Sequence, residues 1–194
     1  RKPMEIITFV VIGLIAVVLI YAVVIYNGLV GLKHGVGKAW ANIDVLLKQR
    51  HDELPKLVET CKQYMQYEQQ TLERVMRART AVSDARAKAD IGSLGAAEGE
   101  LRLGLGNLFA VAEAYPELKA NQTFQHLQER ISGLENSIAD RREYYNESVN
   151  NNNVRIEQFP DLIVARLFSF RLSELLEFSA GDKADPDVGK LFAG

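Results

Sequence analysis

The chain has 194 residues, with 23 basic and 25 acidic side chains and a formal net charge of −2. This balance lacks the basic excess of a nucleic-acid-binding protein, and a single cysteine, Cys61, excludes an internal disulfide framework. About 165 residues remain outside an apolar N-terminal run, which is enough for one domain with a real core.

The first predicted element is an uncharged run over residues 6–26. As a helix, its 21 residues would be about 31 Å long, which matches a hydrocarbon core of about 30 Å. The run exceeds the apolar region of a cleaved signal peptide, and no small-residue cleavage pattern follows it. Tyr21 and Tyr26 suit an aromatic belt at the lipid headgroups. A buried core helix is the alternative, but the pattern favours a retained single transmembrane helix within residues 1–27.

The charges that flank the span do not fix its orientation. Arg1 and Lys2 precede it and Lys33 and Lys38 follow it, so the positive-inside count is a tie. A short basic stretch before a long apolar run is typical of an uncleaved signal anchor. That interpretation would place the following domain outside the cytoplasm.

Residues 28–38 contain glycines at positions 28, 31, 35 and 37. Each glycine costs about 1 kcal/mol in a helix interior, so we expect a flexible Gly-rich collar between membrane and domain. Gly31 and Gly35 match the spacing of a close-packing dimer motif. Because they lie outside the apolar run, a plain linker is the favoured interpretation.

Residues 39–158 carry apolar positions at alternating spacings of three and four, the pattern of amphipathic helices. A first stripe reaches Leu54, after which Pro55 should kink the helix or begin the next one. The stripe then continues at the same rhythm. We therefore expect this helix to end only near Lys88, before a polar loop with the sequence DIGSLG.

A third and a fourth helix complete the predicted bundle. One covers about residues 96–114 and stops at Tyr115-Pro116, because proline disfavours helix in the residue before it. The other begins after a cap at Asn121 or Thr123 and has a regular apolar stripe. Helices joined by short turns predict an all-α fold, with an up-and-down antiparallel four-helix bundle after the span. Its coiled-coil-like stripes imply crossing angles of about 20°.

The C-terminal part divides into segments of contrasting composition. Asparagines at residues 150–153 should break the preceding helix, since asparagine readily bonds its own backbone. Residues 159–178 are rich in Leu, Ile and Phe and predict an extra C-terminal amphipathic or apolar helix. This helix would close the bundle, lie on a membrane surface, or pack against another copy. Residues 179–194 are predicted as a mobile polar tail. The candidate contact residues are Leu162, Ile163, Leu167, Phe168, Phe170, Leu175 and Phe178.

Several charges fall on the apolar stripes. A charge on a core face costs several kcal/mol unless it is paired, so partners should come from facing helices. Such pairs would fix the helix register, whereas snorkelling to solvent or binding a partner protein are the alternatives. The charged stripe residues are Arg50, Glu68, Arg79 and Arg141, and the candidate partners are Glu113 and Glu135.

Residue patterns for catalysis or metal binding are absent. His34, His51 and His126 are not spaced as helical metal ligands, and no Gly-x-Ser-x-Gly elbow occurs. GLGNLF lies inside a helical stripe rather than after a strand, unlike a phosphate loop. Glu98 and Glu100 are interpreted as acidic surface positions, as are Glu113 and Glu117. We therefore expect no enzyme activity, no cofactor and no metal.

A set of short motifs follows the span at matching intervals. It consists of Tyr26-Asn27, Trp40, Arg50, Leu54-Pro55, Tyr67-Glu68, Ala78-Arg79, Tyr115-Pro116, Asn121, Glu135-Asn136, Tyr145-Asn146 and Phe159-Pro160. In this combination the chain resembles the LemA family of bacterial membrane proteins over about residues 26 to 170. One departure is Asn152-Asn153, where the family usually shows a second Tyr-Asn pair. It puts aromatic packing at that junction in question.

The resemblance implies an N-terminal span in the bacterial inner membrane, a four-helix bundle and no established activity. The family's genes often lie beside those for a membrane zinc metalloprotease or a membrane phosphatase-like protein, which implies an adaptor role. The family is usually described with a short N-terminus outside, contrary to the signal-anchor interpretation. The prediction is a membrane-anchored helical scaffold that contacts lipid and binds itself or other envelope proteins. The alternative is a sensory bundle that acts through a separate output partner.

Overall fold

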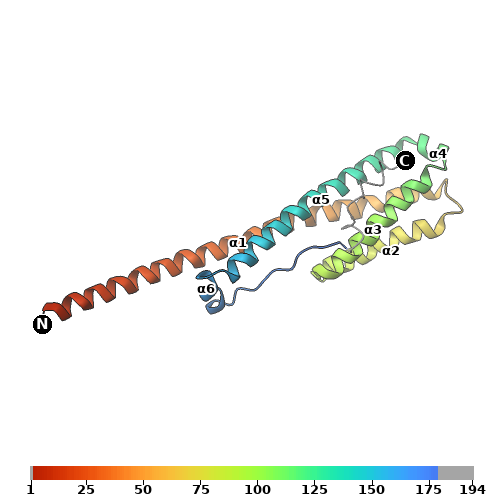
Figure 1. Ribbon diagram of the computed structural model, residues 1–194. Helices are drawn as coiled ribbons and strands as arrows, with labels where there is room; N and C mark the ends of the chain where they lie inside the picture. Colours follow the sequence, from red (N-terminus) through yellow and green to blue (C-terminus); the bar gives the residue numbers. More distant parts are fainter. Residues whose placement is uncertain (1, 179–194) are drawn as a thin grey trace, which may run out of the picture. The chain divides into compact units, whose positions relative to one another are not determined.

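The computed structural model describes residues 2–178, and all regular structure in this range is helical (Figure 1). The chain divides into two compact units, and α1 and α5 contribute residues to both. Unit 1 comprises residues 1–40 and 147–173, and unit 2 comprises residues 41–146 and 174 onward. The helices are α1 (Lys2–Lys62), α2 (Gln69–Ala87), α3 (Ile91–Ala112), α4 (Pro116–Ala120), α5 (Gln122–Glu157) and α6 (Asp161–Leu167). The all-α prediction is confirmed, while the division cuts across the predicted boundaries at residues 38 and 158.

In unit 1, the first part of α1 faces outward on all sides. Its large apolar side chains between Met4 and Val24 are 50–74% exposed. Among the described residues, α1 is the one helix long and apolar enough to cross a membrane. Internal packing begins at Ile25 and Leu29, which form a core with Ile156, Val164 and Ala165 (all on α5 and α6). The change from exposed to buried apolar residues therefore occurs near the predicted end of the span.

The predicted flexible collar is wrong, because α1 is helical through residues 28–38. A Cβ added at any of the four collar glycines would meet no atom within 4 Å, so these glycines face open space. Leu29, Val36 and Ala39 on the same stretch are buried. Burying a leucine or valine is worth about 1.5–3 kcal/mol, which offsets the low helix propensity of glycine. Pro55 also lies inside α1 and does not end it.

In unit 2, α1 ends at Lys62 instead of continuing as one helix to Lys88. Residues 63–68 form a turn, and α2 then runs back along α1, as contacts pair early residues of one with late residues of the other. Within this turn Met65 is 1% exposed. The turn thus keeps the apolar spacing of a helix. For that reason the spacing of the apolar residues does not predict a turn here.

The start of α3 also differs from the prediction. Asp90 caps the helix, with its side chain accepting a hydrogen bond from the Ser93 backbone N–H at 3.0 Å. The sequence DIGSLG is therefore a cap and first turn instead of a loop. Figure 1 shows α2 and α3 side by side. A Cβ at Gly104 would lie 3.4 Å from Val75 Cγ2, so the absence of a side chain permits this close packing.

Helix α5 passes through the asparagine run without the predicted break. It is capped at its start by Asn121, whose side chain accepts a hydrogen bond from the Phe124 backbone N–H at 3.0 Å. Val149 and Ile156 on either side of the run are buried. Their burial, together with the side-chain bonds of Asn153 described next, accounts for the continuous helix.

The predicted C-terminal helix over 159–178 is wrong beyond Leu167, where α6 ends. Residues 171–178 carry no regular secondary structure, because side chains of α5 bind their backbone. In unit 1, the Asn153 amide donates to the Ser173 carbonyl and accepts from its N–H, both at 2.9 Å. In unit 2, the Asn146 amide donates to the Leu176 carbonyl at 3.1 Å and accepts from the Leu176 N–H at 2.8 Å. The predicted polar tail, residues 179–194, lies outside the described residues.

Candidate functional site

The described residues contain no group of three or more His, Cys, Asp or Glu side chains that could hold a metal. His51 instead contacts Arg79, as described below. Cys61 is fully buried, and this burial raises the pKa of its thiol to about 12. Because the thiolate is the reactive form of cysteine, this residue has the properties of an apolar core side chain.

The strongest electrostatic feature of unit 2 is a buried cluster of Arg50, Glu98 and Glu135. Arg50 is 1% exposed, and its Nη1 lies 2.5 Å from Glu135 Oε1 while its Nη2 contacts Glu98. Burial raises the pKa of Glu98, against the opposing effect of Arg50. Burial alone would lower the pKa of Arg50, but the two carboxylates outweigh it and raise it. The cluster ties α1, α3 and α5 together in one register.

Glu98 is the cluster member that the sequence analysis placed on the surface. It is 2% exposed. A signal was present, because Leu94, Glu98 and Leu101 follow the same alternating spacing as the α3 stripe. The nearby Glu100 is exposed and pairs with Arg74 at 3.0 Å. The prediction that Glu98 and Glu100 are both surface residues is therefore wrong for Glu98.

A second set of polar contacts joins α1 and α2. Arg79 Nε donates to the His51 backbone carbonyl at 2.9 Å, and its Nη2 lies 2.7 Å from His51 Nε2. Burial and the charge of Arg79 lower the pKa of His51, so the neutral ring accepts this hydrogen bond. Arg86 Nη2 donates to Asp44 at 3.0 Å, and this bond lowers the pKa of Asp44.

Three predicted core charges lie elsewhere. Glu68 is half-buried in the turn before α2, where its backbone carbonyl accepts from the Leu72 N–H. Arg141 is exposed, whereas its neighbour Arg142 points inward and lies 3.9 Å from the ring centroid of Phe178. Glu113 is exposed and pairs with Lys119, six residues further along the chain, instead of with a facing helix. Two of these predictions are wrong because of the helix phase. Glu68 lies in a turn that the predicted stripe ignores, and after Ile138 the stripe continues four residues on at Arg142 instead of three residues on at Arg141.

The motif residues have mainly structural positions. Asn121 also donates to the Tyr64 hydroxyl at 3.0 Å, and the Tyr145 hydroxyl donates to the Glu174 carbonyl at 3.0 Å. Tyr26 contacts the rings of Phe168 and Phe170, with centroids 4.7 and 5.8 Å away. Pro116 begins α4 and Pro160 precedes α6. Asn27, Asn136 and Phe159 are exposed, and Trp40 and Tyr115 are half-buried.

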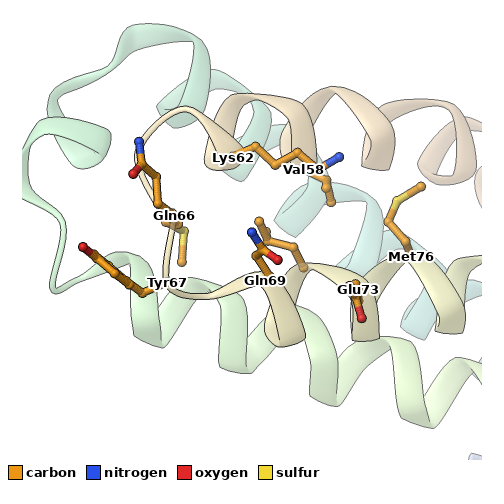
Figure 2. A pocket seen from close by; sticks show the side chains of 9 residues that line it. Val58, Lys62, Gln66, Tyr67, Gln69, Glu73 and Met76 are labelled. Carbon is orange, nitrogen blue, oxygen red and sulfur yellow. The ribbon is translucent and has the colours of Figure 1, made fainter.

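A cavity of about 800 Å³ opens beside the α1–α2 turn in unit 2. Figure 2 shows Val58 and Lys62 on α1 and Met76 on α2 beside it, with Tyr67 on the turn. Tyr67 is 92% exposed. The lining combines apolar walls with a rim of lysine, glutamate and glutamine, and it includes no histidine, cysteine or aspartate. Such a lining suits the binding of an apolar side chain.

Unit 1 carries an exposed apolar surface around α6, which we name the α6 patch. It consists of Phe159, Ile163, Leu167 and Phe168, which are 75%, 59%, 75% and 55% exposed. Ile163 and Leu167 lie one helical turn apart on α6, and Phe159 and Phe168 lie just before and just after the helix. Apolar surface of this kind usually marks a contact with protein or membrane.

Most of the other residues discussed as possible contacts are buried or half-buried. Phe178 is 7% exposed and covered by Arg142, while Phe170 is half-buried against Tyr26. Leu162 is also half-buried, and Leu175 is 43% exposed. The predicted contact surface is thus mainly its first half together with Leu175, because Phe170 and Phe178 pack against their own chain.

An apolar helix that is exposed throughout its first part, joined to helices with buried ion pairs, defines a membrane-associated helical protein. A sequence model of the LemA family matches residues 39–189, and the chain belongs to this family. The resemblance inferred from the short motifs is therefore confirmed.

Curated relatives include the magnetosome proteins MamQ 2 and MamQ 1 of Paramagnetospirillum magneticum. Both are 34% identical to the chain over 87 residues, which is 44% of this chain and 32% of theirs. The magnetosome protein MamQ of Magnetospirillum gryphiswaldense is 33% identical over the same length. The chain thus matches about a third of the length of these relatives.

Proposed function

We propose that the chain is a membrane-anchored helical scaffold that binds itself or other proteins of the bacterial cell envelope, without catalysis. The observation that carries this proposal is the α6 patch, whose four large apolar side chains are at least 55% exposed. Burying each of them would gain about 1.5–3 kcal/mol. Unit 2, which we interpret as an up-and-down four-helix bundle, would serve as the rigid part of the scaffold.

A second copy of the chain is the first partner to test. The full chain, purified in mild detergent, is expected to form particles larger than a monomer by size-exclusion chromatography with light scattering. The double substitution Ile163→Ser and Leu167→Ser should shift these particles toward the monomer, because it places hydroxyls in the α6 patch. Leu103→Ser is the matched control, since Leu103 is 59% exposed on α3 in unit 2. A doubly substituted chain with unchanged particle size would show that the patch does not join subunits.

If the parent chain is itself monomeric, self-assembly fails and binding to other proteins can be tested directly. In-cell crosslinking from a photoreactive residue at Leu167 should then capture an envelope protein, with a membrane metalloprotease among the expected partners. The same residue at Leu103 is the control. Crosslinks to lipid alone would contradict the scaffold proposal.

We place unit 2 outside the cytoplasm, in the orientation of a signal anchor in the inner membrane. Tyr67 suits a test of this orientation, because its side chain is 92% exposed. In a Cys61→Ser background, Tyr67→Cys should react with a membrane-impermeant maleimide in spheroplasts. Labelling only after lysis would reverse the orientation.

The alternative function is sensory, and one observation favours it. Helix α1 continues without a break from the apolar segment to Lys62 in unit 2. An uninterrupted helix is a physical route along which a change at one end can reach the other. A proline at Gly31 should interrupt this route by removing a helix hydrogen bond. If Gly31→Pro abolishes a cellular phenotype while particle size is unchanged, the sensory function gains over the scaffold.

A further inference from the structure

Unit 1 also contains a cavity of about 660 Å³. It lies where α1, α5 and the segment after α6 meet. Tyr26 and Lys33 line it from α1, Asn152 from α5, and Phe168, Phe170 and Arg171 from the following segment. We name this cavity the headgroup pocket, for reasons given below.

Asn152 gives the pocket an unmet requirement for a hydrogen-bond donor. Its side chain is 2% exposed, and its Oδ1 has no hydrogen-bond partner in the described part of the chain. The Nδ2 atom of the same amide donates to Asn153 Oδ1 at 3.3 Å. A buried acceptor without a partner costs about 1–3 kcal/mol. A bound molecule that brings an N–H or O–H group would remove this cost.

Two cationic side chains add a requirement for negative charge. Lys33 and Arg171 are exposed, and neither forms an ion pair within residues 2–178. Both line the pocket that Asn152 also lines. An arginine with its planar fork of donors is well suited to phosphate oxygens, and a lysine adds a point charge. The aromatic rings of Tyr26, Phe168 and Phe170 provide an apolar wall.

The position of the pocket along α1 indicates where such a molecule would come from. Tyr26 is the last residue of the predicted span, and Lys33, the first charged residue after it, follows seven residues later. Seven residues of helix extend about 10 Å. The headgroup region on one side of a bilayer is about 5–8 Å thick. The pocket lining thus begins at the end of the span and reaches just beyond the depth of the lipid phosphates.

We propose that this pocket binds the headgroup of a phospholipid whose alcohol carries a hydrogen-bond donor. Lys33 and Arg171 pair with the phosphate, Asn152 Oδ1 accepts from the ammonium or hydroxyl of the alcohol, and the aromatic wall contacts the glycerol and first acyl carbons. Phosphatidylethanolamine and phosphatidylglycerol meet these requirements. Phosphatidylcholine does not, because its quaternary ammonium has no N–H. Phe168 belongs both to this pocket and to the α6 patch on which the scaffold proposal rests. The tests of the pocket change Asn152 and Arg171, which lie outside the patch, so the two proposals can fail separately.

The donor requirement can be tested with two lipids of the same net charge. The full chain in detergent is incubated with equal amounts of phosphatidylethanolamine and phosphatidylcholine, and retained lipid is measured by native mass spectrometry. We expect about tenfold more ethanolamine lipid than choline lipid on the parent chain, as one satisfied buried acceptor would give. Asn152→Leu should bring this ratio close to one. Asn151→Leu, which changes the exposed neighbour outside the pocket, should leave it unchanged.

A second pair of variants tests the phosphate contact and guards against misfolding at the buried asparagine. Arg171→Gln should lower the retention of phosphatidylethanolamine by about three- to tenfold, as expected for a lost charge-assisted hydrogen bond. Arg166→Gln on α6 removes an equal charge outside the pocket and should have no such effect. The pocket proposal is overturned if the parent shows no preference between the two lipids, or if both arginine variants behave alike.

The last arm distinguishes a lipid from a soluble ester with the same chemistry. Phosphoethanolamine carries the phosphate and the ammonium but no acyl chains. At a concentration equal to that of the lipid, it should fail to displace bound phosphatidylethanolamine. Displacement at equal concentration would overturn the lipid assignment in favour of a soluble phosphate ester.

Discussion

Units 1 and 2 differ in how far their polar side chains find partners within the chain. In unit 2, the two terminal nitrogens of buried Arg50 meet Glu98 and Glu135 from other helices, although its Nε has no hydrogen-bond partner in the described range. In unit 1, the Asn152 Oδ1 is buried without a partner, and Lys33 and Arg171 form no ion pair in the described range. The contrast extends to apolar residues, because the span and the α6 patch of unit 1 are exposed.

The difference indicates a division of roles. A buried polar group that is satisfied within the chain fixes one packing arrangement, while an unsatisfied one invites a ligand. Exposed apolar surface likewise requires lipid or another protein. Unit 2 therefore has the properties of a rigid body, and unit 1 those of the part that contacts the surroundings. The predictions below test this contrast, beginning with the largest expected effect.

Removing the central cation of unit 2 should have the largest effect on stability. Arg50→Ala leaves the buried carboxylate of Glu98 and the partly buried carboxylate of Glu135 without their counter-charge. Breaking a buried pair in this way costs about 3–5 kcal/mol. Thermal unfolding of the full chain in detergent, followed by circular dichroism, measures the loss. Arg77→Ala on the exposed face of α2 is the control, with an expected change within about 0.5 kcal/mol. Equal melting of the two variants would mean that the cluster is not holding the helices.

The packing of the C-terminal segment on unit 2 depends on Gly95. A Cβ at this position would overlap the Glu177 carbonyl oxygen, so Gly95→Ala must displace the backbone of the segment. We expect a loss of about 1–3 kcal/mol, as for other overpacked sites. Hydrogen exchange at the Leu176 amide, which Asn146 binds, should become faster.

Gly133→Ala on α5 is the matched control for Gly95. A Cβ there meets no atom within 4 Å. Alanine in place of a helical glycine should therefore stabilise unit 2 by about 0.5–1 kcal/mol. If both alanine variants are stabilising, residues 174–178 do not pack against α3 as described.

Gly31 lies in the stretch that was predicted as a flexible collar, and it tests whether unit 1 requires flexibility in α1. Gly31 has no atom within 4 Å of an added Cβ, so Gly31→Ala should fit and stabilise α1 by about 0.5–1 kcal/mol. Amide exchange over residues 28–38 should become slower. Faster exchange, or loss of an oligomer that the parent forms, would instead indicate that Gly31 contacts a second helix closely.

Sequence patterns predicted those features that depend on residues close together in the chain. The span required only an uncharged run, and the cap at Asn121 only its position before an apolar stripe. Burial of Arg50 followed from its place in a stripe, and Glu135 was named as a candidate partner. Each of these is a local property that periodicity or composition expresses directly.

Features that depend on distant contacts escaped the sequence analysis. The turn at residues 63–68 buries Met65 at helical spacing, so no change of period marks it. The segment after Leu167 has the composition of a helix but is held by Asn146 and Asn153 from another element. The contacts of Asn153 also bear on the departure from the family motif, in which Asn152-Asn153 replaces a second Tyr-Asn pair. Asn153 binds backbone as Asn146 does, while Asn152 stands where Tyr145 stands in the first pair and lines the headgroup pocket.

The smallest expected effect is a pH dependence that arises from His51 in unit 2. Burial and Arg79 lower the pKa of His51 in the folded chain, so the unfolded chain takes up a proton first as the pH falls. Stability should therefore decrease as the pH drops below about 6.5, the ordinary pKa of histidine, and level off below the folded pKa. The decrease is modest because His51 is only half-buried and solvent screens the charge of Arg79. His51→Gln keeps an acceptor for Arg79 without the titration, so its unfolding midpoint in urea should vary less between pH 7 and pH 5 than that of the parent. His126→Gln, at an exposed position on α5, should retain the full pH dependence of the parent. If His126→Gln flattens the profile and His51→Gln does not, the Arg79–His51 contact does not hold a neutral imidazole.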